Sequence, residues 1–133
     1  MEPHTHMEGI KIGIADNQAR IRLGLGILLD QQPGWHVIIK AADGLNLIDQ
    51  VKINSPDIAL VDWDLPGIPI EILLKYLHEI SADLLVVLLC GRSELRQSAL
   101  MAGANAFASK TEPPEKLIQL IEKLLKKQHT VVD

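Results

Sequence analysis

The chain has 133 residues, of which 47% are apolar and only 3% aromatic, so we expect a single domain with a large aliphatic core. Its 13 basic and 17 acidic residues give a net charge of −4, which argues against direct nucleic-acid binding by this chain. A single cysteine, Cys90, excludes an internal disulfide, and no apolar run approaches the ~20 residues of a membrane span, so we expect a cytoplasmic protein without membrane contact.

Short apolar segments alternate with amphipathic ones along the chain. A polar N-terminal segment (1–9) predicts a disordered tail, the folded domain is expected at 10–127, and a short C-terminal tail follows at 128–133. Five segments have the length and composition of strands: 10–15, 35–41, 58–61, 84–89 and 105–109. Helical spacing predicts helices at 18–31, 45–54, 68–80, 94–102 and from 111–114 onward. In the third helix, the residues expected to face inward are Ile72, Leu73, Tyr76, Leu77 and Ile80.

This strict alternation of strands and helices predicts an α/β fold, a doubly wound parallel sheet with helices on both faces. Right-handed crossovers leave few topologies, and we expect the flavodoxin-like strand order 2-1-3-4-5 with five helices. In such sheets ligands bind outside the carboxyl ends of the strands, at the switch point between the first and third strands.

Charged and amide side chains stand at the carboxyl ends of three predicted strands. Asp16 and Asn17 follow the first strand, Asp62 ends the third and Lys110 ends the fifth. Carboxylate and amide oxygens suit Mg²⁺, and a central carboxylate such as Asp62 can accept a phosphoryl group as an acyl phosphate. A lysine would offset the phosphoryl charge. The alternative is that each acid caps the following helix, and we favour the site because the set includes a lysine.

Three segments around these residues resemble the receiver domain of bacterial two-component response regulators: Ile14–Asn17, Pro56–Gly67 and Ala102–Lys110. The resemblance covers residues 10 to 127. Residues 10–44 are most similar to receivers that precede a helix-turn-helix output domain, which these 133 residues do not include. The resemblance therefore implies a role in signal transduction and in the regulation of transcription.

The resemblance also implies a role for each site residue. Asp62 would accept a phosphoryl group from a histidine kinase or a phosphotransfer protein. Mg²⁺ would be held by Asp16, Asn17, Asp62 and the main-chain carbonyl of Asp64. Lys110 would contact the phosphoryl oxygens.

The sequence departs from the family pattern near the same site. Asn17 stands where the family usually has a second acid, so we expect weaker Mg²⁺ binding. Cys90 stands where a Ser or Thr usually contacts the phosphate. A thiol is a weak donor, so we expect weaker coupling between the phosphate and the conformational switch of the domain. The loop 90–94 is also shorter than usual. Phe107 would occupy the aromatic switch position and move inward on activation.

Two functions remain open at this point. The first is a Mg²⁺-dependent phosphoacceptor, and the second is a pseudo-receiver that binds partners or dimerises without phosphorylation. Receivers often pair through surface helices, so a homodimer is compatible with both. A flavin-binding flavodoxin would need a phosphate cradle after the first strand, where Asp16 stands instead. We do not expect an enzyme, because no His or Ser nucleophile constellation falls at the strand ends.

Overall fold

All five predicted strands form, and helices alternate with them along the chain. The computed structural model describes residues 9–130. The strands are β1 (Ile10–Ala15), β2 (Trp35–Ala41), β3 (Ile58–Asp62), β4 (Leu85–Cys90) and β5 (Ala106–Ser109). The α-helices are α2 (Ala19–Asp30), α3 (Gly44–Asn54), α4 (Ile70–Ile80), α5 (Arg96–Met101) and α6 (Pro114–Thr130). Neighbouring strands are parallel, in the order β2-β1-β3-β4-β5, which confirms the predicted topology.

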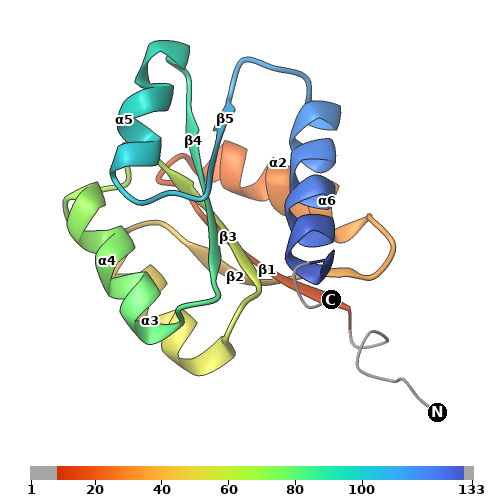
Figure 1. The fold of residues 1–133 in the computed structure, drawn as a ribbon, viewed down its shortest axis with the longest axis horizontal. Coiled ribbons are helices and arrows are strands. Elements are labelled where there is room, and N and C mark those ends of the chain that lie inside the picture. Colours follow the sequence, from red (N-terminus) through yellow and green to blue (C-terminus); the bar gives the residue numbers. More distant parts are fainter. Residues whose placement is uncertain (1–8, 131–133) are drawn as a thin grey trace.

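Helices cover both faces of the sheet, and each face has its own aliphatic core. Helices α2 and α6 lie on one face, whereas α3, α4 and α5 lie on the other (Figure 1). Ile12, Ile14 and Leu60 belong to the first layer, where they meet Leu29 of α2 and Ile121 of α6. Alternate residues of the same strands belong to the second layer. The central strands β3 and β4 are buried on both faces and carry apolar side chains up to their carboxyl ends, whereas the edge strand β2 also exposes His36 and Lys40.

The pairing of the strands brings their functional ends to one edge of the sheet. β1 pairs with β3 in a register that makes Asp16 and Asp62 end neighbouring strands. β4 and β5 also end side by side, and the Lys110 N–H, directly after β5, donates to the Cys90 carbonyl at 2.8 Å. Neighbouring strands lie about 4.8 Å apart, so the side chain of Lys110 must cross the end of β4 to reach Asp62.

Several boundaries differ from the predicted ones. α4 begins at Ile70 rather than at 68, and the predicted helix 94–102 is divided into a 3₁₀ turn (Ser93–Leu95) and the short α5. α6 continues to Thr130, beyond the predicted end of the domain at 127. The rest of the two predicted tails, 1–8 and 131–133, lies outside the described residues. Within 9–130, no helix is both long and apolar enough to cross a membrane.

The buried side of α4 was only partly predicted. Leu73 and Leu77 are fully buried, as expected. Ile72, Tyr76 and Ile80 were expected to face inward, but they are 49%, 50% and 36% exposed. The prediction was wrong for these three because apolar residues occupy more than one side of this helix, so periodicity alone does not identify the side that meets the sheet.

Substitutions on the two sides of α4 test this orientation. We expect Leu73→Ala to lower the free energy of unfolding by about 2–5 kcal/mol, because it leaves a cavity in the core. Ile72→Ala should change it by less than about 0.5 kcal/mol, because that side chain is half exposed. Urea denaturation followed by circular dichroism measures both. Equal losses would show that Ile72 is a core residue after all.

Candidate functional site

Three predicted site residues meet at the carboxyl edge of the sheet. Lys110 Nζ lies 2.8 Å from Asp16 Oδ2 and 3.2 Å from Asp62 Oδ1. Asp16 is 0% exposed and Asp62 is 3% exposed, so the ammonium bridges two buried carboxylates. The side chain of Lys110 remains 20% exposed, which leaves the site open to water on that side.

Local backbone contacts hold the two carboxylates in place. The Gln18 N–H donates to Asp16 Oδ1 at 2.9 Å, and the Asp64 N–H donates to Asp62 Oδ1 at 3.1 Å. Both are contacts to a residue two positions along the chain, so each acid shapes the turn that leaves its strand. The Asp16 carboxylate accepts the N–H of Gln18, the N-cap residue of α2, but no side chain caps the N–H groups of the first turn of this helix. Helix capping, the alternative considered from the sequence, therefore does not account for Asp16.

Arg22 is a part of this site that the sequence analysis missed. Its guanidinium donates to the main-chain carbonyl of Asp16, from one turn into α2. This contact ties α2 to the end of β1 and fixes the backbone that carries Asp16. In the sequence, Arg22 is distinguished only by its position six residues after Asp16. A surface arginine on a predicted helix is too common to be singled out on that basis.

Among the described residues, Lys110 is the one ion-pair partner of the two carboxylates. Burial lowers the pKa of Lys110, but hydrogen bonds and charge attraction from Asp16 and Asp62 outweigh it, so this pKa lies above the ordinary lysine value. Lys110 therefore stays charged at neutral pH, against two carboxylates. Asp16 Oδ2 is fully buried and, apart from its ion pair with Lys110, has no hydrogen-bond partner among the described residues. A second cation would satisfy this oxygen.

The oxygen donors fit Mg²⁺ better than a metal that needs a full protein cage. Within 9–130, no group of three or more His, Cys, Asp or Glu side chains is arranged to hold a metal. Mg²⁺ keeps several waters and takes one or two carboxylates, which Asp16 and Asp62 could supply. Asn17, the next residue after Asp16, is exposed. The carboxylate of Asp64 forms an ion pair with Arg92, in which Oδ1 lies 3.6 Å from Nη2.

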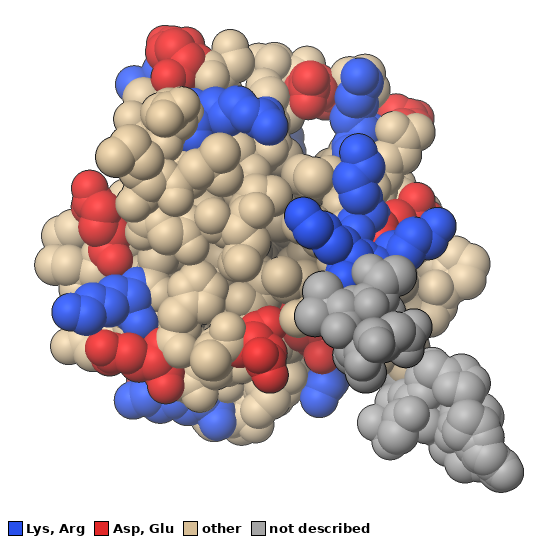
Figure 2. All heavy atoms as spheres, in the orientation of Figure 1, with Lys and Arg blue, Asp and Glu red and all other residues tan. Residues whose placement is uncertain are grey.

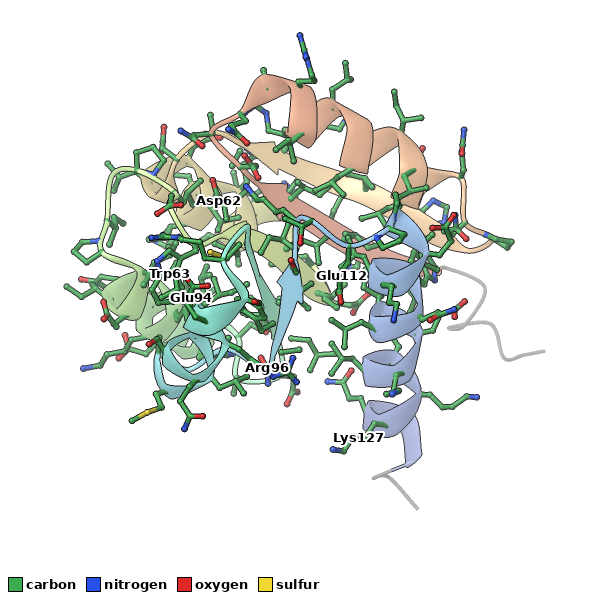
Figure 3. The ribbon with its side chains drawn as sticks, turned by 90° about the horizontal axis from the view of Figure 1, so that it is seen from above. Asp62, Trp63, Glu94, Arg96, Glu112 and Lys127 are labelled. Atoms are coloured by element: carbon green, nitrogen blue, oxygen red, sulfur yellow. The ribbon has the colours of Figure 1, made fainter. Side chains whose placement is uncertain are left out.

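Two further predicted residues lie near the end of β4 and in β5. Cys90 is 2% exposed, and its Sγ accepts a hydrogen bond from the Arg92 N–H at 3.4 Å. Phe107 is 7% exposed and packs in the core layer beneath α3, α4 and α5, so its ring already lies inward. Viewed from above, Asp62 lies at the strand ends, with Trp63 and Glu94 on the side of α4 and α5 (Figure 3).

The sequence matches a known family over most of its length. The profile of the response regulator receiver domain matches residues 12–122. The chain belongs to this family. It is 27% identical over 121 residues to the Fimbriae Z protein of Escherichia coli (strain K12) and 27% identical over 116 residues to the transcriptional regulatory protein DesR of Bacillus subtilis (strain 168). It is 31% identical over 114 residues to the oxygen regulatory protein NreC of Staphylococcus epidermidis.

These matches cover 82–90% of this chain but only 51–58% of the relatives, so the receiver spans about half their length. Among solved structures, a LuxR-family two-component response regulator from Aurantimonas sp. SI85-9A1 is similar with a TM-score of 0.82 and 25% identity, over 90% of this chain and 86% of that one. The isolated receiver domain of RcsB from Salmonella enterica serovar Typhimurium, solved with the phosphomimetic BeF₃⁻, shares the fold with a TM-score of 0.79 and 20% identity, over 89% of each chain. The predicted resemblance to receivers that precede helix-turn-helix output domains is confirmed.

The excess negative charge of the site should lower the stability of the fold. We expect Lys110→Met to lower the free energy of unfolding in Mg²⁺-free buffer by about 3 kcal/mol, because it leaves two buried carboxylates without a counter-ion. Asp62→Asn should raise it, because the substitution removes the repulsion between the carboxylates. Urea denaturation at neutral pH measures both changes, and the reverse order of stabilities would contradict this electrostatic explanation.

The pH dependence of the Lys110→Met deficit provides a control. Because the pKa of Lys110 is raised in the folded state, its contribution is fully present below the unfolded-state value of about 10.4. It is lost only as the pH rises through the higher folded-state value. The difference between wild type and variant should therefore stay constant from neutral pH to about 9 and shrink at more alkaline pH. A deficit that disappears near neutrality would show that Lys110 is not the charged partner.

Proposed function

We propose that this chain is a phosphoacceptor receiver in which Asp62 takes a phosphoryl group from a histidine kinase or a phosphotransfer protein. The observation that supports this proposal is the double contact of Lys110, at 2.8 Å from Asp16 and 3.2 Å from Asp62. A lysine that bridges two buried carboxylates at the open edge of a parallel sheet prepares a site for further negative charge once a cation is present.

In the proposed reaction, a carboxylate oxygen of Asp62 attacks the phosphorus of a phosphohistidine. The new P–O bond forms as the P–N bond breaks. The electron pair of the P–N bond leaves with the imidazole nitrogen, which takes up a proton. Asp62 becomes an acyl phosphate. The contacts of Lys110 and of the Asp64 N–H fall on Oδ1, which makes Oδ2 the attacking oxygen that we assign. Lys110 is then placed to neutralise the phosphoryl oxygens.

Bound Mg²⁺ would supply positive charge to the carboxylates and to the transferring phosphoryl group. Asp16 Oδ2 and Asp62 are the ligands for which the geometry argues most strongly, since one is an unsatisfied buried oxygen and both lie at the same ammonium. Asn17 and the main-chain carbonyl of Asp64 are the remaining proposed ligands. The amide of Asn17 brings no charge, so we propose weak binding.

The output of the proposed switch lies outside these residues. DesR is a transcriptional regulatory protein, and this chain covers 58% of its length. We propose that the receiver acts in the cytoplasm and regulates transcription through an output domain beyond the 133 residues. Cys90 and Phe107 would connect the phosphate to the surface, with the thiol in place of a hydroxyl.

A phosphorylation-independent pseudo-receiver is the second candidate function. The burial of Cys90, whose Sγ already accepts the Arg92 N–H, favours it, because a thiol is a poor donor to phosphate. In that case the fold would act as a protein-interaction or dimerisation module.

Incorporation of phosphate distinguishes the two candidates. We expect wild type to gain one phosphoryl group from acetyl phosphate in the presence of Mg²⁺, and Asp62→Asn to gain none, as measured by intact-mass spectrometry. Asp64→Asn is the matched control, because its side chain is 68% exposed and it should still be modified. Modification of Asp62→Asn would overturn the assignment of the phosphoacceptor. An unmodified but folded wild type would favour the pseudo-receiver.

Mg²⁺ affinity tests the role of Asn17. We expect Asn17→Asp to lower the Kd for Mg²⁺ roughly tenfold, because it adds a negative charge to the ligand set. Gln18→Glu is the control, since it adds the same charge one residue further along an exposed stretch. Isothermal titration calorimetry measures both. An equal effect of the two substitutions would show that position 17 contributes only general charge.

A further inference from the structure

The outer side of α4 carries an exposed apolar row that the proposed phosphorylation chemistry does not use. Ile72, Tyr76 and Ile80 are spaced four residues apart and are 49%, 50% and 36% exposed. Residues four apart lie above one another on the same side of a helix. Single exposed apolar side chains are ordinary, but a continuous row on one helix indicates a contact surface.

A groove runs beside this row, between α3 and α4. It has a volume of about 420 Å³, and Leu45, Ile48, Ile68, Tyr76 and Ile80 form its apolar lining. A second hollow of about 230 Å³ is lined by Ile72, Lys75, Tyr76 and Glu79. Tyr76 and Glu79 line both hollows, so the two hollows are neighbours along α4.

The charged residues that line the two hollows balance one another. They are two acids and two bases: Asp49, Lys52, Lys75 and Glu79. The whole chain carries −4, so this neutral patch avoids the repulsion that two copies would meet elsewhere. Acidic and basic side chains alternate along the left edge of the molecule, over α4 and α3 (Figure 2). Among the described residues, neither Lys75 nor Glu79 has an ion-pair partner.

We propose that the row Ile72–Tyr76–Ile80 and the α3–α4 groove form a dimer interface with a second copy of this chain, in which the two α4 helices pack antiparallel across a two-fold axis near Tyr76. Lys75 and Glu79 lie on the same flank of the row, each one residue before an apolar member. Two antiparallel helices bring identical flanks together, so Lys75 of each copy faces Glu79 of the partner copy. The symmetry makes this ion pair twice, as an isologous interface requires.

A second copy fits this surface better than a different partner of strong charge. A basic or an acidic protein would gain nothing from a patch with two charges of each sign, whereas a two-fold copy pairs Lys75 with Glu79 twice. The proposal goes beyond the phosphoacceptor function and does not depend on phosphorylation.

Exchanging the two charges tests the interface. We expect sedimentation velocity to show a concentration-dependent dimer for wild type. In Lys75→Glu and in Glu79→Lys, like charges meet across the axis, and the dimer Kd should rise at least about tenfold in each. A 1:1 mixture of these two variants should form a heterodimer, because every cross-interface pair is then opposite in sign. The double variant Lys75→Glu/Glu79→Lys should restore the homodimer.

Rescue by mixing separates a broken interface from a misfolded chain, because a misfolded variant would not recover. Met101→Ala is the matched control, since Met101 is an 80% exposed apolar residue on α5 and its loss should leave the dimer unchanged. A wild type that stays monomeric at all concentrations would overturn the proposal. So would unchanged dimers of the single variants, or a mixture of the two that fails to associate.

Discussion

The contact of one ammonium with two buried carboxylates is the interaction on which the rest of the site depends. Lys110 holds Asp16 and Asp62 at 2.8 and 3.2 Å, and without it two like charges would be buried side by side. One positive charge cannot neutralise two negative ones, so the site keeps an excess of negative charge. That excess lowers stability and would favour the binding of a divalent cation, which is the role that we propose for these residues.

The parallel sheet determines where such a site can lie. Its central strands β3 and β4 are buried on both faces, so a charged side chain on them reaches water only at a strand end. β1 and β3 are neighbours, which brings Asp16 and Asp62 together, and β5 is close enough for a lysine to cross the end of β4. The groove between α3 and α4 lies on the same side of the sheet as Phe107, and Ile68 in its lining belongs to the loop that leaves Asp62. The proposed phosphoacceptor and the proposed dimer surface are therefore connected through the loop that carries Ile68.

The sequence predicted the elements that depend on local pattern. Alternating apolar segments predicted the α/β class, and the handedness of crossovers left few strand orders, from which we chose the flavodoxin-like one. The positions of Asp62 and Lys110 at strand ends then predicted that these residues meet. It did not predict the side of α4 that faces the sheet, because Ile72 and Leu73 are equally apolar and only the packed structure distinguishes them. It also missed Arg22, whose contact with the Asp16 carbonyl depends on the tertiary placement of α2. The roles expected for Cys90 and Asn17 concern a phosphate and a metal ion, and contacts among the described residues do not test them.

The most direct test of the central claim is the fluorescence of Trp63 during titration with Mg²⁺ and beryllofluoride. Trp63 adjoins Asp62, whereas Trp35 begins β2, at the opposite end of the sheet, so a Trp35→Phe background isolates the signal. We predict a saturable change that requires Mg²⁺ and is absent in Asp62→Asn. A folded protein whose emission does not change, or changes equally in Asp62→Asn, would contradict the assignment of this site as a phosphoacceptor.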